Sequence, residues 1–167
     1  MSPNTPPRVS GCTYRGLCRY FVTCCTHNRA RVFADAVAAR SLCAQIPPFF
    51  ERRGLAVLAY CVMPDHVHLL LEGVDERADV VEALRAWKQR TGFDWKRRGS
   101  PRLWQKGYHD RVLRDSDDTR AVVRYVLENP IRSGLVRQVS AYQWLGSSRY
   151  TLDELAGHAG EWRPGWK

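Results

Sequence analysis

Apolar residues in this chain recur in some segments at the spacing of a β-strand and in others at the spacing of an α-helix. Alternating or continuous apolar runs, rich in β-branched and aromatic residues, predict strands over residues 19–26, 55–63, 66–73 and 103–114. Apolar residues at helical spacing predict helices over residues 34–53, over residues 77–90, and from the acidic run 115–118 to about Asn129. The tight turn at residues 63–65 favours antiparallel pairing of the two strands that it joins.

Acidic residues and prolines mark the expected helix ends. Asp75 or Asp79 is expected to cap the second helix, and the acidic run 115–118 is expected to cap the third. The Pro47-Pro48 pair is expected to kink or interrupt the first helix, because proline has no amide hydrogen to donate. For the same reason, Pro130 is expected to end the third helix.

This order of strands and helices predicts an α+β fold, the ferredoxin-like sandwich. Such a fold has a four-stranded antiparallel sheet with helices on one face, and here a further helix follows toward the C-terminal end. The other face of the sheet is then available for a functional site. Residues 1–10 are expected to be a disordered lead, residues 11–150 a single domain and residues 151–167 a C-terminal tail.

The composition narrows the class of partner and the cellular compartment. A formal net charge of +9 favours a polyanionic partner such as nucleic acid, although a basic surface that only maintains solubility fits equally well. Six cysteines lie in the first half of the chain without a C-x-x-C pair, which favours reduced thiols in a cytosolic protein over a zinc site. No apolar run approaches the roughly 20 residues of a membrane span, so a soluble protein is expected.

Two histidines on the third predicted strand are candidate metal ligands. His66 and His68 are two residues apart, so they project from one face, while Val67, Leu69 and Leu71 project from the other. Two imidazoles at this spacing can converge on one cation through neutral ring nitrogens. The alternative is a pair of half-exposed strand histidines whose hydrogen bonds are satisfied by water or by neighbouring groups.

A tyrosine and an asparagine share one face of the last predicted helix. Tyr125 and Asn129 are four residues apart, so the phenol and the carboxamide lie one turn from each other beside an apolar stripe. The spacing by itself favours a packing tyrosine followed by an ordinary helix terminator.

Basic residues gather in several segments and are candidates for contacts with DNA. Basic and aromatic residues interleave over residues 87–99, a mixture that suits single-stranded nucleic acid. Trp87 falls on the apolar stripe of its helix and is therefore interpreted as core, so only charged residues are assigned to DNA. The candidates are Arg29, Arg31, Lys88, Arg90, Lys96, Arg97, Arg98, Lys106 and Arg111.

Around the histidine pair and the tyrosine, the sequence resembles the HUH single-tyrosine transposases of small insertion sequences, and most closely their REP-associated branch. The matching segments are YCVMPDHVHLLLE (60–72), LWQKGYHDRVLRDSDD (103–118) and VVRYVLENPIRSGLV (122–136), with YFVTCCTHNRARVF (20–33) as a weaker fourth. The family fold is the same ferredoxin-like sandwich. The chain departs from the family in its alanine-rich first helix and its cysteine-rich first strand.

The resemblance implies the chemistry. It places the nucleophile on Tyr125 and the metal ligands on His66, His68 and Asn129. The expected reaction is cleavage and rejoining of single-stranded DNA through a 5′-phosphotyrosyl enzyme, with Mg²⁺ or Mn²⁺ as cofactor. Since all three ligands are uncharged, weak metal affinity is expected until a DNA phosphate completes the site.

The same resemblance implies a partner and a setting. Hairpin-forming or other single-stranded DNA is the expected partner, and no membrane is involved. The REP-associated branch implies a monomer that works in cis, rather than a homodimer. The expected location is the cytoplasm, in association with the nucleoid.

Two other functions remain open from the residues. A metal-dependent hydrolase would use the histidines and Asn129 to activate water, with Tyr125 only assisting. A non-catalytic protein would use the sheet as a platform for hairpin DNA or RNA.

Overall fold

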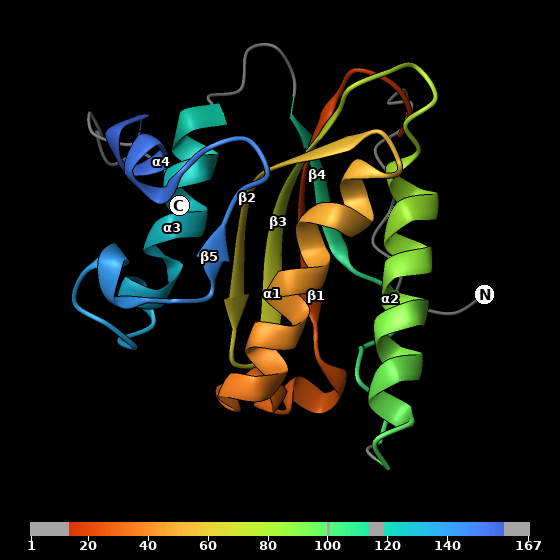
Figure 1. Ribbon diagram of the computed structural model, residues 1–167, viewed down its shortest axis with the longest axis vertical. Helices are drawn as coiled ribbons and strands as arrows, with labels where there is room; N and C mark the ends of the chain where they lie inside the picture. Colours follow the sequence, from red (N-terminus) through yellow and green to blue (C-terminus); the bar gives the residue numbers. More distant parts are fainter. Residues whose placement is uncertain (1–13, 100, 114–118, 159–167) are drawn as a thin grey trace.

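The computed structural model describes residues 14–99, 101–113 and 119–158, and it confirms an α+β fold built on an antiparallel sheet (Figure 1). The sheet has the order β4-β1-β3-β2-β5, and every neighbouring pair of strands is antiparallel. The strands are β1 (Arg19–Cys25), β2 (Leu55–Met63), β3 (His66–Gly73), β4 (His109–Leu113) and β5 (Leu145–Gly146). The helices are α1 (Ala36–Glu51), α2 (Val80–Lys96), α3 (Thr119–Arg132) and α4 (Leu152–His158), with short 3-10 turns at His27–Arg29, Val32–Ala34 and Val139–Ala141.

The sheet separates two hydrophobic clusters. Helices α1 and α2 cover one face, where they bury Trp87 and Phe50 against the strands. Helices α3 and α4 pack on the other face, where Val126 and Leu155 are buried (Figure 1). All nine residues of β2 are buried, because this strand is covered on both faces. The molecule therefore has three layers, and α3 lies on the face opposite α1 and α2.

The fifth strand is an addition to the four that the sequence predicts. β5 pairs with β2 through Tyr60 and Cys61, and only glycine fits beside the tyrosine. A Cβ atom on Gly146 would lie 2.5 Å from the phenol oxygen of Tyr60. The predicted fourth strand is correspondingly shorter: β4 begins at His109, and before it Trp104 makes only an isolated bridge to Thr26.

The prolines do not act as the sequence suggests. α1 runs to Glu51 through the Pro47-Pro48 pair, so of the expected kink or interruption, the interruption is wrong. Ile46, Phe49 and Phe50 are buried around the pair, and this packing offsets the two missing hydrogen bonds near the end of the helix.

The third helix likewise continues past its proline. α3 extends beyond Pro130 to Arg132, and Pro130 itself is buried. The helix ends at Arg132, and Gly134, two residues beyond it, has a φ of +70°, the left-handed conformation that commonly terminates helices. The expectation that Pro130 ends the helix is therefore wrong, and the glycine four residues later was the better signal.

The second helix begins as predicted and ends later. The Asp79 side chain accepts a hydrogen bond of 2.9 Å from the Glu82 amide and caps α2, which confirms one of the two candidate caps. The helix reaches Lys96, six residues beyond its predicted end, so it carries most of the basic segment.

Some predictions concern residues outside the described part of the chain. The lead at residues 1–10 and the acidic run 115–118 lie outside it, as do residues 159–167 of the predicted tail. The tail begins with α4, in which Leu155 is buried against the α3 layer. The five described cysteines are all free thiols. Among the described helices, none has the length and apolar character to span a membrane.

Candidate active site

The two histidines of β3 face each other on the side of the sheet that carries α3. The Nε2 atoms of His66 and His68 are 3.1 Å apart, and the ring centroids are 4.7 Å apart at 81°. Leu70, two residues further along the same strand, belongs to the α3 cluster, whereas Val67 and Leu69 belong to the α1 and α2 cluster. The structure therefore confirms that β3 has one face in the α1 and α2 core and an opposite face that carries the histidines.

Each imidazole is oriented through its other nitrogen. The Nδ1 atom of His66 donates to the Asp65 carboxylate over 2.6 Å. The Nδ1 atom of His68 lies 2.9 Å from the hydroxyl oxygen of Thr23, which stands opposite it on β1. Because the Nδ1 atom of each ring has a hydrogen-bond partner, the two Nε2 atoms are the ones that face each other. Metal-binding histidines are commonly oriented in this way, by a hydrogen bond at the nitrogen that does not bind the metal.

Burial keeps both imidazoles neutral. It lowers the pKa of His68 to about 3, and the neighbouring His66 adds to the decrease, whereas a hydrogen bond with Asn129 opposes it. Burial also lowers the pKa of His66, against the opposing effect of Asp65. Neutral rings have a free lone pair at ordinary pH, which ligation of a cation requires.

Helix α3 brings the predicted tyrosine and asparagine to the same place. The Tyr125 ring centroid lies 5.6 Å from that of His68, edge-on at 75°, and 5.6 Å from that of Phe21. Phe21 in turn stacks on His68 with the ring centroids 5.5 Å apart. Asn129 is buried, and its side chain hydrogen-bonds His68. The four residues proposed from the sequence are therefore one cluster.

The donor set fits a divalent cation. Two nitrogen ligands about 2.1 Å from one octahedral ion and at right angles to each other lie about 3.0 Å apart. The observed 3.1 Å between the Nε2 atoms of His66 and His68 matches that separation. Within the described residues, no group of three or more His, Cys, Asp or Glu side chains could hold a metal. Asn129, whose side chain hydrogen-bonds His68, is an amide in this cluster that could serve as a third protein ligand.

Asp65 and Arg29 form a supporting layer that the sequence did not reveal. Arg29, a candidate DNA contact, pairs with the second carboxylate oxygen of Asp65 at 3.0 Å. Its guanidinium also lies 2.8 Å from the sulfur of Cys25. Asn28 and Arg29 both have positive φ, 53° and 55°, a costly conformation that holds the arginine beside the site. The sequence feature that could have indicated this layer is Asp65, an acidic residue directly before His66.

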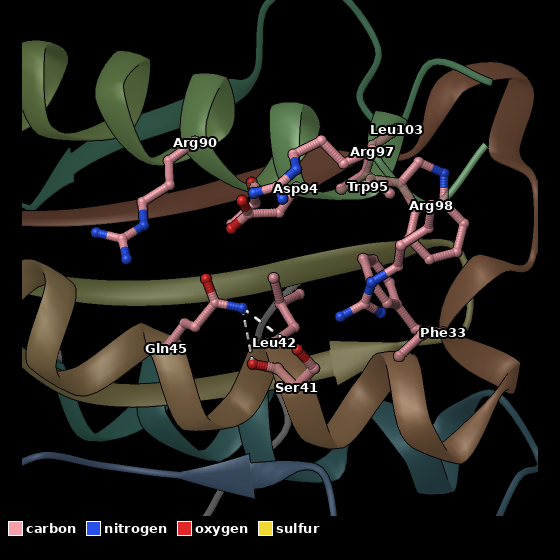
Figure 2. Close-up of a pocket in the computed structure, with 12 residues that line it drawn as sticks. Phe33, Ser41, Leu42, Gln45, Arg90, Asp94, Trp95, Arg97, Arg98 and Leu103 are labelled. Atoms are coloured by element: carbon pink, nitrogen blue, oxygen red, sulfur yellow. Dashed lines mark hydrogen bonds between the residues drawn. The ribbon is translucent and has the colours of Figure 1, made fainter. Parts of the chain in front are cut away.

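Several other basic candidates lie on the α1 and α2 layer. Arg90, Arg97 and Arg98 line a groove of about 520 Å³ between these helices. Figure 2 shows Arg90 and Asp94 on the α2 side of this groove and Gln45 on the α1 side. The groove reaches the end of the sheet that carries the histidines, because Phe33 in its wall donates a backbone hydrogen bond of 2.9 Å to Pro64.

The remaining basic candidates are dispersed. Lys96 and Lys106 line a second groove, on the other side of α2. Lys88 is half-buried and donates to the backbone carbonyls of Gln105 and Gly107, so it fastens the segment before β4. Arg31 is exposed. Arg111 stands opposite Phe21 in the sheet and thus shares its face with the histidines.

Comparisons with known proteins point to one family. The family model described as "Transposase IS200 like" matches residues 14–129, most of the chain. A Haemophilus influenzae protein provisionally named a REP-associated tyrosine transposase is 25% identical over 116 residues, which span 63% of this chain and 66% of that protein. The REP-associated tyrosine transposase of Escherichia coli K12 is 31% identical over 91 residues, 53% of this chain and 52% of that protein. The chain thus spans between half and two thirds of these relatives.

A solved structure shares the fold. It is a REP-associated tyrosine transposase bound to a REP hairpin, and it superposes with a TM-score of 0.64. The match covers 87% of this chain and 82% of that chain at 20% sequence identity. The three-layer arrangement described above is therefore found in a protein of known structure.

Proposed function

The chain belongs to the family of IS200-like transposases, and from this premise we propose that it is a metal-dependent endonuclease and strand transferase for single-stranded DNA. The observation that carries the proposal is the position of Tyr125 against His68, with the ring centroids 5.6 Å apart. This places a phenol beside a pair of neutral imidazoles within one chain. A nucleophile next to a cation site is the arrangement that phosphoryl transfer to a tyrosine requires.

In the proposed reaction, Tyr125 attacks a DNA phosphodiester. A bond forms between the phenol oxygen and phosphorus, and the bond from phosphorus to the 3′-oxygen breaks. The phenol loses its proton and the 3′-oxygen gains one, which leaves a 5′-phosphotyrosyl enzyme and a free 3′-hydroxyl. The covalent link conserves the energy of the phosphodiester, so the reverse attack by a 3′-hydroxyl rejoins DNA.

His66, His68 and Asn129 would hold the cation. A bound Mg²⁺ or Mn²⁺ supplies positive charge that polarises the phosphate and offsets the charge developing on it. The protein's own contribution is orientation: Asp65 and Thr23 hold the imidazoles so that both Nε2 atoms face one point. Phe21 packs against both the His68 and Tyr125 rings and limits their movement.

Hairpin-forming DNA is the proposed substrate. Two relatives are named REP-associated tyrosine transposases, and the structural neighbour is described as bound to a REP hairpin. The net charge of +9 suits a polyanion, and three arginines line the groove between α1 and α2: Arg90 of α2, and Arg97 and Arg98 directly after it. A single strand that leaves the histidine site around Phe33 would enter this groove.

A monomer is the proposed working form. The tyrosine contacts the histidine of its own chain, so all four proposed site residues come from one copy. No residue from a neighbouring copy is needed to complete this set.

The test is covalent trapping. The protein is incubated with Mn²⁺ and hairpin oligonucleotides that carry single-stranded flanks, and the products are run on a denaturing gel. Wild type should give a protein–DNA adduct and Tyr125→Phe should give none, with loss of cleavage. Cleavage retained by Tyr125→Phe would instead support a hydrolase that activates water, and binding without cleavage by wild type would support a non-catalytic platform.

A further inference from the structure

Arg132 covers one face of the proposed nucleophile. Its guanidinium carbon lies 4.2 Å from the centroid of the Tyr125 ring, over the ring face. The two residues are seven apart on α3, hence two turns from each other on the same side of the helix. Phe21 and His68 also contact this ring, each in a T-shaped arrangement with the ring centroids 5.6 Å apart.

Within the described part of the chain, no carboxylate pairs with Arg132. Glu128, one turn earlier on α3, pairs instead with Arg124 at 3.8 Å. Among the residues that the structure describes, no Asp or Glu lies within ion-pair distance of Arg132. Arg132 is thus an exposed cation beside the phenol, with no counterion among the residues of the structure that are described.

A stacked guanidinium retains its hydrogen-bonding capacity. When its plane packs on an aromatic ring, the N–H groups point outward from the plane's edge and can still bind an oxyanion in a bidentate manner. Stacking also fixes the position of a long side chain, which reduces the entropy lost when an anion binds. The phosphorus atom that Tyr125 attacks must lie within bonding reach of the phenol oxygen, and hence next to this guanidinium.

We propose that Arg132 is a further catalytic residue, which binds a non-bridging oxygen of the scissile phosphate and holds that phosphate against Tyr125. This inference rests on the proposed function, since it assumes that Tyr125 attacks DNA. Arg132 then balances the negative charge that develops on the phosphoryl oxygens as the phenol bond forms. A cation held by His66, His68 and Asn129 would be a second positive charge beside the same phosphate.

A purely structural role makes a different prediction. Arg132 lies in the last turn of α3, where a cation also interacts favourably with the helix dipole. If stacking and the dipole were its only roles, replacing it would lower stability and leave the interaction with one particular phosphate unchanged.

The experiment is a double-mutant cycle that combines substitution of Arg132 with neutralisation of a single DNA phosphate. The scissile position is first mapped with wild-type protein, and an oligonucleotide is then made with a neutral methylphosphonate at that single linkage. Binding of both oligonucleotides is measured in EDTA, where no bound cation contributes, in a Tyr125→Phe background that prevents cleavage. The variants are Arg132→Gln and the control Arg137→Gln, which removes the same charge from an exposed position beyond the helix.

With Arg132 present, the neutral linkage should weaken binding about tenfold, as expected for one charge-assisted hydrogen bond. With Arg132→Gln the loss should be less than twofold, and with Arg137→Gln it should again be about tenfold. An equal loss in all three proteins overturns the role of Arg132. Wild type that forms no adduct with any hairpin oligonucleotide rejects the proposed function itself, and this inference with it.

A second measurement separates charge from packing. With the Tyr125 hydroxyl retained, Arg132→Ala should form the covalent adduct at least tenfold more slowly than wild type, and added guanidinium ion should restore part of the rate. Arg132→Lys, which keeps the charge without the planar group, should fall between the two. Adduct formation by Arg132→Ala at the wild-type rate would contradict the proposal.

Discussion

The carboxylate of Asp65 accepts a hydrogen bond of 2.6 Å from the Nδ1 atom of His66, the residue that directly follows it. A carboxylate in this position selects the tautomer whose lone pair is on Nε2 and increases the basicity of that nitrogen. The other carboxylate oxygen pairs with Arg29, so the aspartate is itself held in place. The turn that connects β2 to β3 thus also orients the first histidine of the site.

Replacing Asp65 should weaken metal binding without removing a ligand. Asp65→Ala should reduce the affinity for Mn²⁺ about 10- to 100-fold, measured by calorimetry, because His66 loses its orienting partner. Asp65→Asn should fall between that variant and wild type, since the amide oxygen still accepts the hydrogen bond without the charge. Glu76→Gln, at an exposed residue on the connection to α2, is the control. Equal affinity in Asp65→Ala and wild type would show that the hydrogen bond does not support the ligand.

Metal and DNA should bind cooperatively. The three proposed ligands carry no charge, so a phosphate oxygen is expected to complete the coordination of a hard cation. Affinity for Mn²⁺ should therefore rise when a single-stranded oligonucleotide is bound to Tyr125→Phe protein. Manganese should support adduct formation at least as well as magnesium, since imidazole suits it better. Calorimetry that gives the same metal affinity with and without DNA would reject this coupling.

Stability should fall in acid because His68 resists protonation in the folded state. Its pKa is about 3 when folded and about 6.5 when unfolded, so between these values the unfolded chain binds the additional proton. The free energy of unfolding should therefore fall as pH decreases from about 6.5, by up to about 1.4 kcal/mol per pH unit for this group.

Urea unfolding in EDTA at several pH values tests this sign. Carboxylates contribute to acid unfolding in every variant, so the informative quantity is the difference between His68→Gln and wild type. That difference should favour His68→Gln progressively as the pH falls below 6.5. His109→Gln, at an exposed position of β4, should behave as wild type does. Parallel curves for His68→Gln and wild type would show that the imidazole is not buried in its neutral form.

The period of apolar residues predicted the four main strands because each is long enough to show alternation or a continuous buried run. β5 has only two residues, too few for any period, and its place depends on the close approach of Gly146 to Tyr60. Local rules also failed at Pro130, where the buried surface of α3 outweighs one missing hydrogen bond. Tertiary packing decided these points, and packing is not encoded in any short segment.

The candidate site, like the fold, could be predicted from the sequence only in part. Spacing placed His66 with His68, and Tyr125 with Asn129, because periods of two and of nearly four fix which residues share a face. Spacing could not show that α3 crosses the sheet at the histidines, since that depends on how two distant surfaces pack. The contact between Arg132 and Tyr125 depends on side-chain conformation and could be found only in three dimensions.

The groove between α1 and α2 leads to a final prediction about DNA affinity. Arg97 and Arg98 line this groove, and each phosphate contact with a basic residue contributes about one unit to the dependence of log affinity on log salt concentration (Figure 2). Arg97→Gln with Arg98→Gln should weaken binding of a hairpin with a long single-stranded flank and reduce its salt slope by about 1 to 2. The same double variant should bind a hairpin without the flank as wild type does, because the proposed path brings only the single strand past Phe33. Arg40→Gln with Arg52→Gln, at two exposed residues outside the groove wall, is the control that removes the same two charges. If the flanked and unflanked hairpins lose affinity equally, the arginines act through general attraction and the groove is not the path of the strand.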